Sequence, residues 1–197
     1  ELVECFGQIF VQGYAATETA MFVAVLDKAA HQPGNAAALK HLSSAGQPTP
    51  GVELYISDAE GKSLPCGETG EIRIRCPGII KGYYNSPEAT AAEFDNGYWK
   101  SGDLGYLDAD GYLYIVDRIK DMIITGAENV YPAEVESAIY GHPDVADVAV
   151  IGIPDEKWGE AVKAIVVAKP GTSPDPADII AFARTRIAGF KCPKSVD

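Results

Sequence analysis

The chain has 197 residues, of which 47% are hydrophobic, and a mean hydropathy of −0.02. These totals are typical of a soluble protein that buries either one large core or two small ones. The formal net charge of −12 repels phosphate backbones and anionic lipid surfaces, which argues against a nucleic-acid or membrane-surface role. No apolar run approaches the roughly 20 residues that a membrane-spanning helix needs, so we expect no transmembrane segment.

The four cysteines are widely separated and form no C-x-x-C pair, and no histidine stands at zinc-ligand spacing from them. We therefore expect free thiols in a reducing cytosol rather than a disulfide framework. The first residues contain neither an initiator methionine nor a signal-peptide pattern, so we expect the chain to be a piece of a longer protein.

Near the start, the apolar run Ile9–Val11 predicts a short buried strand that leads into a small-residue loop at residues 12–19. Such a loop at the end of a buried strand is where α/β sheets place ligands. The alternative is a surface turn with a capping threonine, and the residues alone leave both interpretations open. From His31 to Pro50, frequent glycine, proline, alanine and serine predict an irregular connection.

Alternating apolar and polar residues then predict strands near residues 52–56 and 71–75, with turns at 58–61 and 108–111. Asp108 and Asp110 do not fit a calcium loop, because its twelfth position would hold aspartate instead of glutamate. Ser86-Pro87-Glu88 predicts a short helix that continues to about residue 94. Asp103, beside Gly102, is either a turn former or a carboxylate that reaches a ligand's hydroxyl groups.

The pattern changes at Asp117, where we expect two structural units to meet. Beyond it the sequence predicts a strand at 122–124, a loop at 125–129, a helix from Pro132, strands at 145–153 and 160–167, and a last helix. The last helix should be capped by Ser173–Asp175 and end at Gly189. The residues expected to face inward are Val135, Ala138 and Ile139 in the first helix and Ile179, Ile180, Ala183 and Ile187 in the last.

No complete phosphate loop, dinucleotide fingerprint, nucleophile elbow or H-E-x-x-H helix occurs in the sequence. Seven segments nevertheless resemble, in order, those of the adenylate-forming superfamily, which includes acyl- and aryl-CoA synthetases, peptide-synthetase adenylation domains and firefly luciferase. Each segment is weak by itself, but seven in register cover nearly the whole chain. They are Gly13–Glu18, Gly46–Glu53, Gly67–Ile72, Gly82–Asn85, Trp99–Leu104, Gly111–Arg118 and Asn129–Glu136.

The resemblance implies a mixed α/β fold. Residues 1–116 would be the C-terminal part of an AMP-binding N-terminal domain, with a β-rich, distorted-barrel subdomain at about residues 45–116. Residues 117–197 would form a small, mobile C-terminal α/β domain. Asp117 would be the hinge on which this domain swings between an adenylating and a thioester-forming orientation.

In the superfamily a carboxylate attacks the α-phosphate of ATP, which gives an acyl-adenylate and pyrophosphate, and a thiol then displaces AMP. By resemblance, Tyr14 would lie against the adenine ring, Thr17 would offer its hydroxyl to the phosphate, and Glu18 would hold Mg²⁺. Asp103 would accept hydrogen bonds from both ribose hydroxyls. Arg118 would contact the ribose or phosphate side of ATP.

Gly126 would enter the site in the thioester step, where the missing Cβ leaves space for the pantetheine arm of CoA. The alternative for Gly126 is an ordinary turn glycine. Ala15 stands where the family usually has glycine, and its Cβ is tolerated if φ stays negative. Two lysine-bearing elements of the family, the phosphate loop and the C-terminal Gly-Lys, are not in the chain. Lys191 and Lys194 only approach the second element, so we expect that the chain alone does not adenylate.

The resemblance therefore implies a cytoplasmic, ATP-dependent CoA ligase for a fatty or aryl acid, with Mg²⁺ as cofactor and CoA as co-substrate. The alternatives are an adenylation domain that loads a carrier protein and a non-catalytic module that binds nucleotide or a partner. We also expect disturbed packing of residues 1 to about 44, whose exposed strand edges could pair with another chain in a homo-oligomer.

Overall fold

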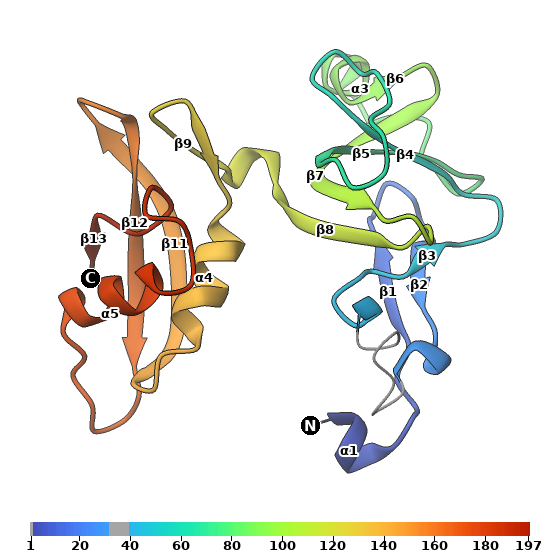
Figure 1. Ribbon diagram of the computed structural model, residues 1–197. Coiled ribbons are helices and arrows are strands. Elements are labelled where there is room, and N and C mark those ends of the chain that lie inside the picture. The colour runs from blue at the N-terminus through green and yellow to red at the C-terminus, as the bar shows by residue number, and fades with distance from the viewer. Residues whose placement is uncertain (1, 32–39) are drawn as a thin grey trace. The chain divides into compact units, whose positions relative to one another are not determined.

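The computed structural model describes residues 2–31 and 40–197, so part of the connection predicted between His31 and Pro50 lies outside the described residues. The chain divides into two compact units, Glu1–Ile115 and Val116–Asp197 (Figure 1). Within the described part of the chain, no helix is long and apolar enough to cross a membrane.

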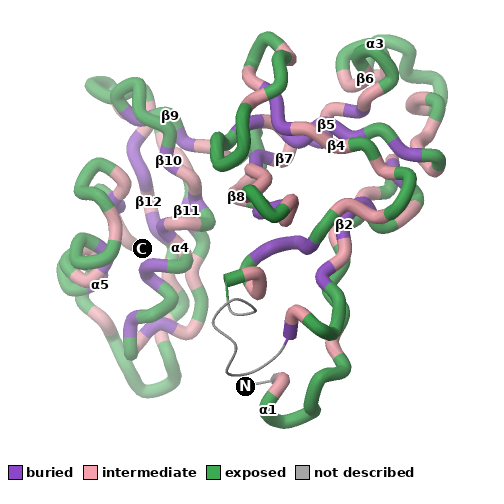
Figure 2. The backbone as a smooth tube through the Cα atoms, turned by 45° about the vertical axis from the view of Figure 1, so that its right-hand side comes forward, coloured by how far each residue is buried: buried purple, intermediate pink, exposed green. Residues whose placement is uncertain are grey.

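The first unit opens with helix α1 (Leu2–Phe6) and a three-stranded antiparallel sheet in the order β1-β2-β3. Its strands are β1 (Gln12–Ala15), β2 (Phe22–Leu26) and β3 (Gln47–Pro48), and the short 3-10 helix η1 (Lys28–His31) follows β2. The central strand β2 is the most deeply buried, because Val23 and Ala24 are fully enclosed (Figure 2).

The strand predicted at Ile9–Val11 is wrong. The structure begins the strand at Gln12, and the side chains of Ile9 and Val11 are 64% and 58% exposed. Hydrophobic, β-branched residues form a stable strand only where a neighbouring strand completes their hydrogen bonds. Among the described residues, β2 pairs with Gln12–Ala15 and gives Ile9–Val11 no such neighbour. The packing predicted to be disturbed over residues 1 to about 44 stays a prediction, and residues 1 and 32–39 lie outside the described range.

A second, five-stranded sheet follows the order β4-β5-β7-β6, with β8 paired to β7. Helix α3 (Pro87–Glu93) lies between β5 and β6 along the chain, as the Ser86-Pro87 pattern predicted. The predicted turns at residues 58–61 and 108–111 are present, each closed by a glycine with positive φ. The strands are β4 (Glu53–Ser57), β5 (Gly70–Arg75), β6 (Phe94–Asp95), β7 (Tyr98–Leu107) and β8 (Leu113–Arg118).

The two sheets of this unit are joined where β8 meets the chain just before β3. The Ala45 N–H donates to the Leu113 carbonyl at 2.7 Å, and the Leu113 N–H donates to the Gly46 carbonyl at 2.8 Å. Gly46 has a φ of +94°, and a Cβ there would collide with the backbone of Val25, so only glycine fits this junction. The sheets therefore curl around a shared core that includes Val23, Ile56, Ile72, Ile74, Trp99 and Leu113.

The second unit is an α/β layer with its own core. Its sheet has the order β10-β9-β12-β11, with the short β13 parallel to β12. Two helices pack on the sheet, α4 against β11 and α5 against β13 (Figure 1). The elements are η2 (Ile119–Asp121), β9 (Ile123–Thr125), β10 (Glu128–Val130), α4 (Pro132–Tyr140), β11 (Val145–Asp155), β12 (Gly159–Ala168), α5 (Pro176–Arg184) and β13 (Ser195–Val196).

The helices of this unit bury the residues that their spacing predicted, with two differences. Val135 and Ile139 of α4 and Ile179 and Ala183 of α5 are buried in the core, whereas Ile180 and Ile187 are only partly buried. Helix α5 ends at Arg184 and does not reach Gly189.

The early end of α5 has a local cause. The Thr185 hydroxyl donates to the Phe182 carbonyl at 2.8 Å, and the Arg186 N–H bonds the Ala183 carbonyl three residues earlier. These contacts tighten the last turn and stop the helix. The loop predicted at residues 125–129 is shorter in the structure, where residues 126–127 form the turn of a tight hairpin between β9 and β10. The fold class, mixed α/β with a β-rich first part and a small α/β unit after it, is confirmed.

Candidate functional site

Two of the predicted nucleotide residues meet in the first unit. Tyr14 lies on β1 and Asp103 on β7, 89 residues later, and the Tyr14 hydroxyl donates to Asp103 Oδ2 at 2.6 Å. Both side chains are half-buried. A short O–H···O⁻ bond of this kind is charge-assisted and fixes the orientation of the carboxylate.

The backbone around Asp103 is also held in place. The Ser101 hydroxyl donates to the Ile72 carbonyl at 2.7 Å and accepts from the Asp103 N–H at 3.0 Å. Gly102 has a φ of +70° between them, with open space where a Cβ would stand. The positive φ explains why glycine precedes this carboxylate.

Thr17 and Glu18 lie on the turn that connects β1 to β2. The turn is organised by Thr19, a fully buried residue that no sequence pattern singled out. Its hydroxyl accepts from the Ala16 N–H at 3.2 Å and donates to the Ala16 carbonyl at 2.9 Å. A threonine closes the turn, which agrees with the interpretation of residues 12–19 as a surface turn. Thr17 is exposed and Glu18 is half-buried, which agrees with the interpretation as a ligand-binding loop. The φ of Ala15 is not positive, which is the condition under which its Cβ is tolerated.

One oxygen of the Glu18 carboxylate already has a donor. The Tyr83 hydroxyl lies 3.1 Å from Glu18 Oε1. Burial raises the pKa of the Tyr83 phenol, and the neighbouring Glu18 carboxylate raises it further, so Tyr83 is the proton donor of this pair at neutral pH. Within the described ranges no residue donates a hydrogen bond to Glu18 Oε2, which leaves a hard carboxylate oxygen of the type that Mg²⁺ binds.

Asp117, the predicted hinge, is anchored within the second unit. Its Oδ1 accepts from the Arg118 N–H at 2.8 Å, and its Oδ2 accepts from the Ala133 N–H at 3.0 Å. Ala133 belongs to the first turn of α4, whose own N-cap residue, Tyr131, makes no side-chain cap bond. Asp117 therefore supplies the acceptor, and the negative charge, that a helix N-terminus favours.

Gly126 lies at the tip of the β9–β10 hairpin, where Gly126 and Ala127 have φ values of +59° and +68°. The ring of Trp158 covers it, because a Cβ on Gly126 would come within 2.6 Å of Trp158 Cε3. The Gly126 N–H also donates to the Trp158 carbonyl at 2.9 Å. The turn therefore requires glycine at position 126 for two reasons, the positive φ and the close packing of the Trp158 ring. Its predicted contact with CoA stays a prediction.

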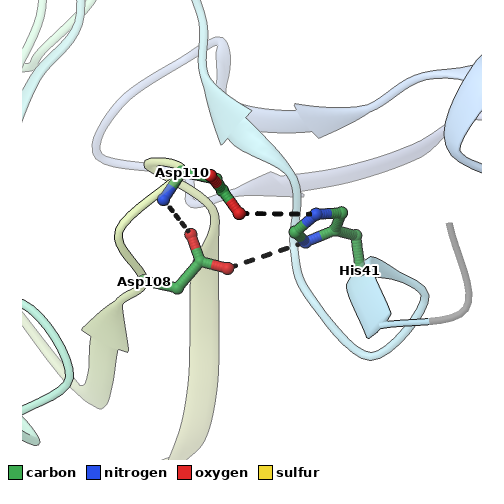
Figure 3. Close-up of side chains that lie close together, drawn as sticks. All are labelled: His41, Asp108 and Asp110. Atoms are coloured by element: carbon green, nitrogen blue, oxygen red, sulfur yellow. Dashed lines mark hydrogen bonds and ion pairs between the residues drawn. The ribbon is translucent and has the colours of Figure 1, made fainter. Parts of the chain in front are cut away.

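A separate polar cluster lies where His41 faces the turn between β7 and β8 (Figure 3). His41 stacks on Tyr112, with ring centroids 3.7 Å apart. Its Nδ1 lies 3.6 Å from Asp108 Oδ2, and its Nε2 lies 3.9 Å from Asp110 Oδ2. The Lys40 ammonium is 3.4 Å and 3.3 Å from the same two carboxylates.

This cluster is better explained as ion pairs than as a metal site. The two ring nitrogens of His41 each lie near a different carboxylate, and a neutral imidazole has only one nitrogen lone pair to offer a metal. The ammonium of Lys40 already supplies a cation to Asp108 and Asp110. We infer that the cluster holds residues 40–46 in place within the first unit.

Of the predicted site residues, Tyr14, Thr17, Glu18 and Asp103 belong to the first unit, and Tyr14 and Asp103 are in direct contact. Asp117, Arg118 and Gly126 belong to the second unit. The assigned roles of these seven residues stay predictions. Thr19, Tyr83 and Ser101 were not predicted from the sequence, although Tyr83 and Ser101 each lie inside one of the seven family-like segments.

Comparisons with known proteins agree on the family. The model of the AMP-binding enzymes matches residues 1–84, and the model of the AMP-binding enzyme C-terminal domain matches residues 134–197. A feruloyl-CoA synthase from Amycolatopsis sp is 47% identical over 97% of this chain. A fatty acid–acyl-carrier-protein ligase from Streptomyces coeruleorubidus is 45% identical over 93% of it. The chain spans only 38% and 35% of the lengths of these two relatives.

Solved structures give the same result. The amide bond synthetase of Marinactinospora thermotolerans aligns with 98% of this chain and 39% of its own, at a TM-score of 0.87 and 39% identity. The o-succinylbenzoate CoA synthetase of Bacillus subtilis, solved with ATP and a magnesium ion, aligns with 94% of this chain and 37% of its own, at a TM-score of 0.83 and 36% identity. The chain therefore belongs to the family of AMP-binding, adenylate-forming enzymes.

Proposed function

We propose that the whole protein is an AMP-forming acid–thiol ligase. In the first step a substrate carboxylate attacks the α-phosphate of ATP, which yields an acyl-adenylate and releases pyrophosphate. In the second step the thiol of CoA attacks the acyl carbon, and AMP leaves. The observation that carries the proposal is the Tyr14–Asp103 hydrogen bond, because it joins two residues that the family pattern assigns to the nucleotide.

The first unit fits a nucleoside. Tyr14 offers a half-buried aromatic face for a flat base, and its hydroxyl holds Asp103. A carboxylate fixed in this way can accept hydrogen bonds from the two adjacent hydroxyls of a ribose. Ser101 keeps the Asp103 backbone from turning away, so the acceptor is preorganised before the nucleotide arrives.

The same unit fits a divalent cation. Glu18 would hold Mg²⁺ through its second carboxylate oxygen, and the exposed hydroxyl of Thr17 on the same turn would face the phosphates. The cation would neutralise the charge that develops on the α-phosphate and pyrophosphate. Thr17 and Glu18 would orient those groups for attack.

The second unit would supply the later contacts. Arg118 would touch the ribose or phosphate side, and Gly126 would approach the pantetheine arm of CoA. We propose that residues 1–116 and 117–197 are parts of two domains with Asp117 as their hinge. Because the Asp117 carboxylate bonds the first turn of α4, a change of its backbone angles would move α4 together with the second unit.

The substrate class that we propose is a fatty or aryl carboxylic acid, in line with the feruloyl and fatty-acid relatives. Free CoA is the proposed acceptor, and the four free thiols suit a cytoplasmic location. The Streptomyces coeruleorubidus relative keeps the alternative of a carrier-protein acceptor open. A further alternative is a non-catalytic module that binds nucleotide or a partner, and a homo-oligomer through residues 1 to about 44 stays a proposal.

The nucleotide site is tested by Asp103→Ala in the whole protein. We expect the affinity for AMP, measured by calorimetry, to fall on the order of 100-fold, because two hydrogen bonds to a charged acceptor, each about 1.5 kcal/mol, are lost. Glu60→Ala, at an exposed turn of the same unit, should leave AMP affinity unchanged. AMP affinity in Asp103→Ala equal to that of the wild type would contradict the assignment.

A further inference from the structure

Tyr83 is built into the first unit by contacts on several sides. Its N–H donates to Thr90 Oγ1 at 2.9 Å, and that hydroxyl in turn donates to the Ser86 carbonyl at 2.9 Å. The preceding Gly82 has a φ of +151°, and a Cβ there would come within 2.6 Å of Thr90 Cγ2. Helix α3, which carries Thr90, therefore fixes the backbone from which the Tyr83 side chain extends.

The segment before Tyr83 is docked on the Glu18 turn. The Ile80 N–H donates to the Glu18 carbonyl at 2.8 Å. Gly78 passes so close to the Thr19 carbonyl that a Cβ at this position would collide with it. The Cys76 thiol lies 3.7 Å from the same carbonyl. These contacts hold residues 76–83 against the turn, so the distance between Tyr83 and Glu18 is set by the backbone on both sides.

The ring and the hydroxyl of Tyr83 are also oriented. The Phe94 ring contacts the Tyr83 ring edge-on, with centroids 6.3 Å apart and planes at 65°. The Tyr83 hydroxyl lies 3.1 Å from Glu18 Oε1, which fixes the direction in which the phenol donates.

We propose that Tyr83 is a positioning residue for Glu18: its hydroxyl occupies Oε1 and turns Oε2 toward the divalent cation that accompanies the nucleotide. This inference rests on the proposed function, since it takes Glu18 as a cation ligand. The 3.1 Å contact links residues 65 positions apart, and among the described residues Tyr83 is the one hydrogen-bond donor to the Glu18 carboxylate. A partner that orients a metal-binding carboxylate typically contributes about 10-fold or more to metal affinity.

The test compares Tyr83→Phe with Tyr84→Phe in the whole protein. The first variant keeps the ring and removes only the hydroxyl, and the second removes a hydroxyl from a neighbouring side chain that is 92% exposed. The readout is the dissociation constant of Mn²⁺, measured by electron paramagnetic resonance in the presence of a non-hydrolysable ATP analogue. We expect about 10-fold weaker Mn²⁺ binding for Tyr83→Phe and no change for Tyr84→Phe.

Two further measurements separate positioning from a general loss of stability. Glu18→Gln should weaken Mn²⁺ binding more strongly, and adding Tyr83→Phe to it should weaken binding no further, because the two residues act through one carboxylate. The thermal midpoint of Tyr83→Phe should stay close to that of the wild type. Unchanged Mn²⁺ binding in Tyr83→Phe, with or without a lowered midpoint, would overturn the inference while leaving the proposed function intact. Unchanged binding in Glu18→Gln would overturn the role of Glu18 and the inference with it.

Discussion

The two carboxylates of the candidate site each have one tyrosine hydroxyl as partner. Tyr14 holds Asp103 at 2.6 Å, and Tyr83 holds Glu18 at 3.1 Å. In both pairs the tyrosine is distant in sequence from the carboxylate. A hydroxyl donates one proton and can occupy only one carboxylate oxygen at a time, so each tyrosine fixes the orientation of its carboxylate.

The Asp108 carboxylate has a structural duty that depends on pH. Burial raises its pKa, but the N–H groups of Tyr112 and Asp110 and the Lys40 ammonium outweigh burial and hold the pKa below its ordinary value. A carboxyl whose pKa is lower in the folded state stabilises the fold above its unfolded pKa, and the effect is lost as the pH falls through the folded value.

We therefore predict that Asp108→Asn lowers the unfolding free energy by about 1–3 kcal/mol at pH 7. The difference from the wild type should shrink as the pH falls below about 4, the ordinary pKa of an aspartate, and should vanish once the folded carboxyl is protonated as well. Asp58→Asn is the matched control, because Asp58 opens a similar turn and its carboxylate accepts the Lys62 N–H without a nearby lysine ammonium among the described residues. Chemical denaturation at several pH values provides the measurement, and a loss at Asp108 that does not vary with pH would refute an ionic origin.

The candidate residues of this site were expected from the sequence, whereas the residues that support them were not. Tyr14, Glu18 and Asp103 lie in segments whose order resembles that of the adenylate-forming enzymes. The contact between Tyr14 and Asp103 is consistent with the expectation that both bind the nucleotide. Tyr83 also lies in such a segment, but its contact with Glu18 was not predicted, because one hydrogen bond across 65 residues leaves no periodicity or spacing in the chain. Thr19 was missed for a similar reason, since a buried hydroxyl that closes a turn looks the same in sequence as an exposed one.

At the scale of elements, the β9–β10 hairpin and the β11–β12 hairpin are locked together at Gly126. The Trp158 ring, at the turn of the second hairpin, lies on the tip of the first, and Gly159 pairs with Thr125. Glu160 reinforces the contact, because its Oε2 accepts the Ile124 N–H at 2.7 Å. The tip of the β9–β10 hairpin is therefore a packed structure rather than a free loop.

Gly126→Ala should separate the two chemical steps of the whole protein. The added Cβ meets Trp158 and adopts a positive φ, so the hairpin tip must shift. We predict that CoA-dependent thioester formation falls roughly 10-fold or more, while ATP–pyrophosphate exchange stays within about twofold. Gly171→Ala is the matched control, because Gly171 has a φ of +83° but open space at its Cβ. An equal loss in both steps would argue against a role confined to thioester formation.

The element predictions succeed where periodicity is long and fail in short segments. The helices from Pro132 and Pro176 begin at prolines with the acidic first turns that their sequences carry, and each buries most or part of its predicted apolar face. Ile9–Val11 has the composition of a strand, but composition does not specify whether a neighbouring strand is present. The hairpin at residues 123–130 is short, and its turn uses Gly126 and Ala127, a pair without a strong turn signature.

At the scale of the whole molecule, each unit has a core of its own. Ile72, Ile74 and Leu113 are central in the first, and Val135, Val162 and Ile179 are central in the second. The strand β8 crosses from one unit to the other, and Asp117 near its end is fixed to α4. Separate cores joined by one strand suit a protein whose units move relative to each other during a reaction cycle.

The central claim is that the whole protein couples ATP cleavage to thioester formation with free CoA. The most direct measurement supplies fatty and aryl acids, ATP, Mg²⁺ and CoA, and quantifies AMP, pyrophosphate and acyl-CoA by chromatography. We predict that all three products form in equal amounts with at least one acid, and that the 197-residue chain alone gives only background ATP–pyrophosphate exchange. Formation of ADP, transfer of the acyl group only to a carrier protein, or substantial exchange by the chain alone would contradict this mechanism.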